Sequence, residues 1–148
     1  MPAPFAATAP RHWLRAAALA CAPALAAACG DASTSPSDLA GTYALVGVAG
    51  QALPYTTADD AYTYVTTDGT LYLSQDRTYR VEVNSRVIDR RTNFGQSVTD
   101  VGTGTYTLSG SRLTVYPDAS SDVALNQTTT GTVSGSTVTV DVFTFARQ

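Results

Sequence analysis

The sequence predicts an all-β fold, namely an eight-stranded antiparallel up-and-down barrel that follows an N-terminal signal peptide. From Leu39 onward, short runs of alternating apolar and polar residues are separated by Gly, Asp, Ser and Asn. Val, Thr and Tyr dominate these runs, which is typical of a pleated, half-buried surface. Consecutive strands that are apolar on one face must close or stack to hide their edges, and eight of them suit a closed barrel.

The eight strands can be placed along the chain by their turns. The first is expected at Thr42–Val48. Asp68-Gly69 is typical of a two-residue turn, so Tyr62–Thr67 and Thr70–Ser74 are expected to form a hairpin. The other five strands are expected at Thr78–Asp89, Val98–Leu108, Arg112–Tyr116, Thr128–Val133 and Thr137–Phe145. No helix is expected in this part of the chain.

The alternation also predicts which side chains form the core. Middle strands place one set of apolar residues on a common face: Leu71, Leu73, Tyr79, Val81, Val83, Leu113 and Val115. In the last strand, Val138 and Val140 are out of phase with Phe143 and Phe145. A β-bulge near Asp141-Val142 is expected to bring both pairs inward.

The N-terminus predicts a targeting segment. Arg11, His12 and Arg15 precede Ala16–Ala28, an uncharged run of thirteen residues. That length fits the apolar region of a secretory signal and is too short for a spanning helix. The predicted organisation is therefore a signal peptide at residues 1–28, a flexible tether at 29–38, which is polar and contains Pro36, and a barrel domain at 39–148.

The run Leu25-Ala26-Ala27-Ala28-Cys29 resembles the bacterial lipobox, although Ala26 stands where Leu is common. The resemblance implies that the Cys29 thiol takes a diacylglycerol and becomes the new N-terminus. Gly30 lacks the Asp that retains enterobacterial lipoproteins at the inner membrane, so we expect the outer membrane if the organism has one. Two alternatives remain: modification at Cys21, and an ordinary secretory signal cut after Ala28.

The domain itself resembles the lipocalin-like, calycin-type barrels of small bacterial lipoproteins. Gly41–Leu45, Gly50–Tyr55, Leu71-x-Leu73, Thr78-Tyr79 and the closing Phe143–Arg147 carry the resemblance. It implies an eight-stranded barrel with an internal cavity or a packed core. Lipocalins begin with Gly-x-Trp and place a late Arg across that Trp. Here Tyr43 takes the place of Trp, and Arg147 is the expected partner at the closed end of the barrel.

Composition excludes several function classes. A chain cut before Cys29 carries seven Arg against twelve acidic residues, a net charge of −5, which disfavours nucleic-acid binding. It contains no His, and its one Cys would be acylated. His- or Cys-ligated zinc and nucleophile–His catalysis are thereby excluded, so we expect no enzyme, metal or cofactor.

An enzyme that uses Asp carboxylates is disfavoured, because no residue supplies a tuned acid–base partner, and two binding functions remain. The first is a ligand-binding module with a small apolar or amphipathic molecule inside the barrel, lined by Tyr43, Tyr79, Tyr106, Phe143 and Phe145. The alternative is a tethered protein-interaction or inhibitor module with a filled barrel, which uses loops such as Gln51–Asp60 or Phe94–Gly102. An open apolar pocket favours the first function, and a filled barrel with exposed aromatics favours the second.

Overall fold

The structure, a computed structural model, describes residues 35–119 and 125–148. The expected signal peptide, the lipidation site Cys29 and most of the tether lie outside the described residues. The described part contains a single helical turn, α1 (Pro36–Leu39), and ten strands: β1 (Gly41–Val48), β2 (Gln51–Ala52), β3 (Tyr55–Ala58), β4 (Tyr62–Leu73), β5 (Thr78–Asp89), β6 (Gly95–Ser109), β7 (Arg112–Pro117), β8 (Thr129–Ser134), β9 (Thr137–Val140) and β10 (Phe143–Arg147).

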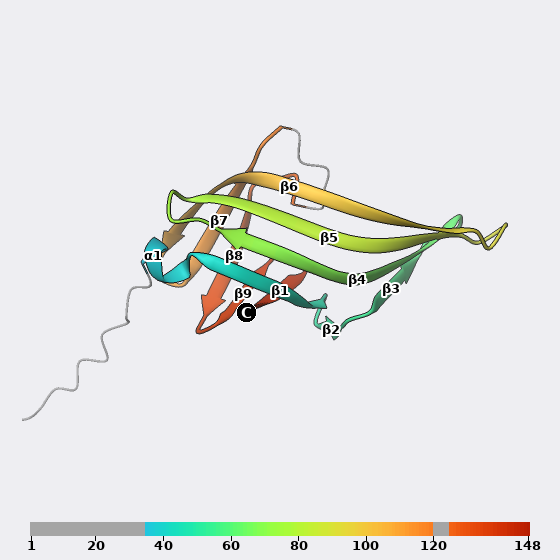
Figure 1. The fold of residues 1–148 in the computed structure, drawn as a ribbon, viewed down its shortest axis with the longest axis horizontal. Coiled ribbons are helices and arrows are strands. Elements are labelled where there is room, and N and C mark those ends of the chain that lie inside the picture. The colour runs from blue at the N-terminus through green and yellow to red at the C-terminus, as the bar shows by residue number, and fades with distance from the viewer. Residues whose placement is uncertain (1–34, 120–124) are drawn as a thin grey trace, which may run out of the picture.

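Eight of these strands close into an antiparallel barrel, as the sequence predicts (Figure 1). Each strand from β4 to β10 pairs with the next, and β1 pairs with both β10 and β4. This is the up-and-down order, consistent with the calycin-type fold that the resemblance implies. The short strands β2 and β3 are additions that pair with β1 and β4. Among the described residues, no helix has the length and apolar character needed to span a membrane.

The expected hairpin at Asp68-Gly69 is wrong. Residues 62–73 form the single strand β4, in which the register against β5 shifts between Thr66 and Asp68. The glycine serves close packing at this β-bulge, because a Cβ on Gly69 would lie 2.7 Å from the carbonyl oxygen of Glu82. The bulge exchanges the faces of the side chains on its two sides.

The expected bulge at Asp141-Val142 is also wrong. Residues 141 and 142 form a two-residue turn between β9 and β10, and Asp141 has a φ of 53°. The turn pairs Val140 with Phe143 and Val138 with Phe145, so all four side chains point inward as expected. The number of barrel strands remains eight. The expected hairpin at residues 62–74 is the single strand β4, and the expected single strand at residues 137–145 is the hairpin of β9 and β10.

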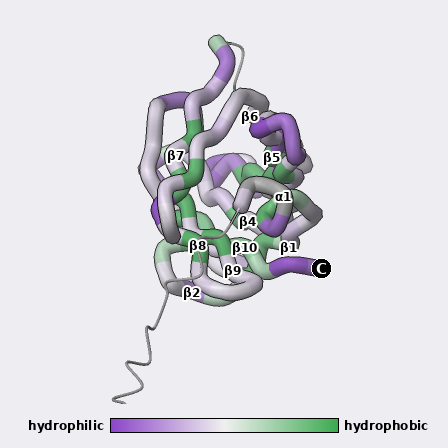
Figure 2. Tube along the Cα trace, turned by 90° about the vertical axis from the view of Figure 1, so that its left-hand side faces the viewer, coloured by the Kyte–Doolittle hydropathy of each residue, from purple (hydrophilic) through white to green (hydrophobic). Residues whose placement is uncertain are grey.

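The barrel interior holds a continuous hydrophobic core. Its eighteen residues are between 0% and 7% exposed, and they include every side chain that the alternation places inward. Figure 2 shows hydrophobic stretches on the barrel strands, among them β7, β8 and β10. Two core residues come from outside the strands: Leu39, in α1, and Leu125, in the connection between β7 and β8.

Three strands extend well beyond the barrel (Figure 1). β4, β5 and β6 are 12, 12 and 15 residues long, whereas β7 to β10 have four to six residues each. The N-terminal half of β4, the C-terminal half of β5 and the N-terminal half of β6 therefore form a projecting sheet, to which β3 adds a fourth strand. We call this part the projecting sheet.

Candidate functional site

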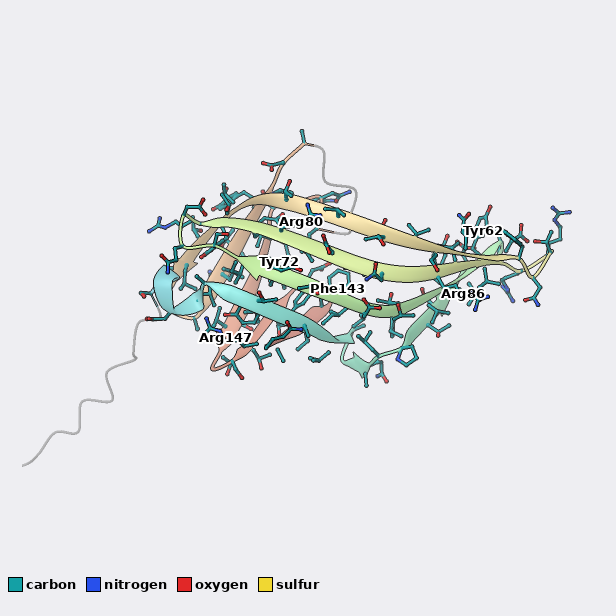
Figure 3. The ribbon with its side chains drawn as sticks, viewed as in Figure 1. Tyr62, Tyr72, Arg80, Arg86, Phe143 and Arg147 are labelled. Atoms are coloured by element: carbon teal, nitrogen blue, oxygen red, sulfur yellow. The ribbon has the colours of Figure 1, made fainter. Side chains whose placement is uncertain are left out.

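The five aromatic residues expected to line a ligand cavity all lie in the core. Tyr43, Tyr79, Tyr106, Phe143 and Phe145 are buried, and the Phe143 and Phe145 rings lie 6.2 Å apart (Figure 3 labels Phe143). None of these five rings lines the two cavities on the projecting sheet that are described below. The rings contribute to a packed barrel interior.

Two of the three buried tyrosines are fixed by hydrogen bonds to the main chain. The Tyr43 hydroxyl donates to the carbonyl oxygen of Leu39 at 2.6 Å, and the Tyr106 hydroxyl donates to that of Ser74 at 2.7 Å. The Tyr79 hydroxyl is buried and has no hydrogen-bond partner among the described residues. Burial, followed by the nearby negative charge of Asp118, raises the pKa of Tyr79. A buried hydroxyl that stays unpaired destabilises the fold.

The expected closure of the barrel end is present. Tyr43 pairs with Arg147 in the register of β1 and β10, and the Arg147 guanidinium carbon lies 5.5 Å from the centroid of the Tyr43 ring. The same guanidinium donates a hydrogen bond to the carbonyl oxygen of Ala40. The end of the last strand is thereby held against the start of the first.

The exposed aromatic residues of the projecting sheet form a second, distinct feature. The register pairs Tyr64 with Val87 and Tyr62 with Asp89, and the β4 bulge places these side chains on the face that continues the barrel interior. Tyr62 and Tyr64 lie 6.2 Å apart, and Tyr55, on β3, packs against the core. Phe94, next to the start of β6, is 70% exposed, and Tyr62 is 41% exposed. We call Tyr55, Tyr62, Tyr64, Val87 and Phe94 the aromatic platform.

A small cavity opens at the tip of the aromatic platform. Its volume is about 170 Å³, and its lining residues are Tyr62, Val87, Asp89, Phe94 and Gln96. Figure 3 shows Tyr62 at this end of the molecule, far from Phe143 and Arg147. A mixed aromatic and polar lining of this size fits one side chain of a partner rather than a whole small ligand.

Hydrogen bonds hold the two turns at the tip together. The Asp59 carboxylate accepts from the amides of Ala61 and Tyr62 at 2.8 and 2.7 Å and from the Tyr64 hydroxyl at 3.1 Å. Arg90 reaches across from the β5–β6 turn, with its guanidinium on the Asp59 carbonyl and its amide on the Ala61 carbonyl. The Tyr64 side chain and the main chain at Tyr62 are thus held by Asp59.

The main-chain amides of the two turns also lower the pKa values of the carboxylates that they contact. The amides of Tyr62 and Ala61 lower the pKa of Asp59. The amides of Thr92 and Arg91 do the same for Asp89. Both carboxylates accept hydrogen bonds from turn amides, and the Arg90 guanidinium donates to the Asp59 carbonyl. Glu82 is held by Arg80 at 2.5 Å within the same strand.

The opposite face of the projecting sheet carries a polar groove. The Asn84 amide donates to Asp68 at 2.5 Å, and the Thr99 hydroxyl donates to Asn84 at 2.7 Å, a chain that crosses from β4 to β6. A cavity of about 310 Å³ lies here, lined by Thr67, Asp68, Asn84, Ser85, Arg86, Ser97, Val98 and Thr99. We call it the polar groove.

Sequence reasoning found only part of this surface. Of the two segments expected as interaction loops, Gln51–Asp60 contains β2 and β3, and Phe94–Gly102 is mostly the first half of β6. Tyr62 and Tyr64 were expected within a strand of an ordinary hairpin. The sequence contains Tyr55, Tyr62, Tyr64 and Phe94 close to the expected turns. Only the bulge in β4 shows that Tyr62 and Tyr64 lie on the inner face.

Comparison with models of protein families finds no match for this chain, and comparisons with curated proteins and with solved structures find none either. Within residues 35–119 and 125–148, no group of three or more His, Cys, Asp or Glu side chains is arranged to hold a metal ion.

Proposed function

We propose that this protein is a non-catalytic lipoprotein of the bacterial cell envelope whose barrel holds a protein-binding platform away from the membrane. Diacylglycerol on Cys29 anchors the chain, in the outer membrane where the organism has one. Residues 29–38 tether the barrel to the lipid. The chain cleaved before Cys29 does not bind nucleic acid, given its net charge of −5.

One observation carries this proposal: the large exposed aromatic side chains Phe94 and Tyr62 lie together on a projecting sheet, while the aromatic side chains of the barrel interior are buried in the core. Tyr and Phe are enriched in protein interfaces because they contribute a large contact area at low conformational-entropy cost. Neighbouring Thr, Ser and Asn side chains supply the hydrogen bonds of an interface rim.

Site-specific photocrosslinking in cells tests this function. A photoreactive residue replaces Phe94 in the full chain, and the matched control carries it at Tyr116, an exposed aromatic residue on β7. We expect a discrete protein adduct from position 94 that is absent at position 116 and is lost when Tyr62→Ser is added. Equal adducts at both positions, or none at 94, would contradict the proposal.

A second candidate is a small apolar or amphipathic ligand inside the barrel, and the unpaired Tyr79 hydroxyl favours it. A polar atom of such a ligand would satisfy that hydroxyl. The two candidates differ in the readout that Tyr79→Phe affects. The substitution removes a ligand contact in the second and leaves the platform adducts unchanged in the first.

A further inference from the structure

Along the outer edge of β6, the described residues place a neighbouring strand on one side of the main chain only. β5 pairs with β6 from Gly95 to Thr105, whereas β7 pairs with it only from Gly104 onward. The amide of Asp118 donates to the carbonyl oxygen of Thr103 at 2.8 Å and ends the paired part. From Gly95 to Gly102, the described residues place no strand along this edge.

The direction of each main-chain group follows from that last hydrogen bond. Thr103 presents its carbonyl away from β5, and in a strand every second residue presents its N–H and C=O to the same edge. The register with β5 shows no shift, so Ser97, Thr99 and Val101 present theirs outward as well. Within the described part of the chain, these outward groups have no hydrogen-bond partner.

Apart from the charge of Asp100, which lies on the inner face, this edge lacks the features that usually prevent pairing. Between Gly95 and Thr103 there is no Pro, Lys or Arg and no bulge, and Val98, Thr99 and Val101 favour extended structure. By contrast, the other outer strand of the projecting sheet, β3, has four residues and follows Pro54. The β6 edge is therefore the one suited to receive a strand.

We propose that a partner protein adds an extended, basic segment as a strand along the β6 edge, with apolar side chains alternating along it. This deepens the proposed function and rests on it. Main-chain hydrogen bonds to Ser97, Thr99 and Val101 supply affinity, and alternate side chains supply specificity. On one face the segment's apolar side chains extend the aromatic platform beside Val98. On the other face its polar side chains reach the polar groove, which Ser97 and Thr99 line.

Charge selects the partner. The chain is acidic, with a net charge of −5 after cleavage, and Asp118 lies where the free edge ends. A basic segment is attracted to this edge, whereas a second copy of the chain is repelled. A two-fold pairing of β6 edges about Thr99 would also set Val98 opposite Asp100, an apolar residue against a charge.

The test uses a short synthetic peptide in which Val alternates with Thr, Lys and Arg, labelled with a fluorophore, and the full-length protein in detergent micelles. Anisotropy gives the affinity. Ser97→Pro removes one outward N–H without removing a bond to β5, and Ser97→Ala is the matched control. The same peptide with N-methyl groups along one edge makes the equivalent change without altering the protein.

We expect the peptide to bind wild type and Ser97→Ala equally, and at least tenfold more weakly to Ser97→Pro. The N-methylated peptide should bind the wild-type protein with an affinity at least tenfold lower than that of the unmethylated peptide. Equal binding by Ser97→Pro and by the methylated peptide, or no binding at all, overturns the inference, and adducts at position 94 still report on the proposed function separately. A dimer in sedimentation that Ser97→Pro dissolves would assign the edge to a second copy and overturn it too.

Discussion

The guanidinium of Arg147 lies 5.5 Å from the centroid of the Tyr43 ring, so the last residues of the final strand cover the first aromatic residue of the first strand. The contact joins residues that are more than one hundred positions apart in the chain. It holds one end of the barrel and fixes the register of β1 against β10.

Substitutions at this contact should affect stability unequally. Tyr43→Ala is expected to cost about 3–5 kcal/mol, because the ring is buried and leaves a cavity. Arg147→Ala is expected to cost about 1 kcal/mol, because Arg147 is exposed to solvent. Urea denaturation measures both. Tyr72→Ala, on the exposed face of β4, is the control and should stay within about 0.5 kcal/mol of wild type. A Tyr43→Ala variant as stable as wild type would show that the ring does not support the barrel end.

Gly104 should tolerate no side chain. A Cβ at this position would lie 2.1 Å from the carbonyl oxygen of Tyr116 and 2.9 Å from the Cα of Pro117. Gly104→Ala is therefore expected to cost about 3 kcal/mol or to prevent folding, since main-chain atoms must move. Gly110→Ala, where φ is +60° and nothing lies within 4 Å, should cost only about 1 kcal/mol. Comparable thermal midpoints for the two variants would contradict the close packing of β6 and β7.

Removing the Tyr79 hydroxyl should stabilise the protein. Tyr79→Phe keeps the ring and removes a buried polar atom without a described partner, so we expect a gain of about 1 kcal/mol. Burial raises the pKa of Tyr79 above the unfolded value of 10.0. Titration of Tyr79 therefore leaves the free energy of unfolding unchanged below pH 10 and lowers it as pH rises from 10 through the folded pKa. Tyr79→Phe should therefore reduce the loss of stability at alkaline pH. A destabilised variant would show that the hydroxyl has a partner.

Acid should weaken the tip of the projecting sheet. The pKa of Asp59 is lowered below 3.8, so its stabilising contribution is present above that value and is lost as pH falls through the folded pKa. Asp59→Asn should be less stable than wild type at pH 7 and lose less stability between pH 7 and pH 3. Hydrogen exchange of the Ala61 and Tyr62 amides checks this locally. Asp60→Asn controls for the loss of one charge, and identical profiles for Asp59→Asn and wild type would exclude the role of these amides.

Cys29→Ser should release the protein from the membrane. The substitution removes the thiol that is expected to carry diacylglycerol, and one lipid-dependent anchor is then lost. Fractionation and the intact mass should both change, with the domain in the soluble fraction and no acyl mass. Cys21→Ser is the matched control and should leave both unchanged. Release by Cys21→Ser alone would move the site to the other cysteine.

The closed barrel, its inward side chains and the meeting of Tyr43 with Arg147 could be predicted from the sequence, because alternation and strand order determine them. The two wrong predictions, a hairpin at Asp68-Gly69 and a bulge at Asp141-Val142, have physical causes. Gly69 avoids contact with the Glu82 carbonyl, and in the sequence such a glycine looks the same as one that permits a positive φ. Asp141 adopts a φ of 53° without glycine, so no typical turn pair marked that hairpin.

The aromatic platform and the β6 edge could not be predicted in the same way. Both depend on how far β4, β5 and β6 extend beyond their neighbours, which is set by register between distant segments. The bulge at Thr66–Asp68 then decides that Tyr62 and Tyr64 continue the inner face. The alternation of apolar and polar residues on each side of the bulge can be read from one sequence. The register shift that joins the two parts of β4 cannot.

Native mass spectrometry of the full-length protein, extracted from its own membrane, tests most directly whether this barrel presents a protein-binding platform rather than enclosing a ligand. We expect the mass of the cleaved chain with its lipid on Cys29, bound to a protein partner that Phe94→Ser and Tyr62→Ser release, and with no small molecule in the barrel. A stoichiometric small molecule that persists in those two variants and is lost in Tyr79→Phe would contradict it.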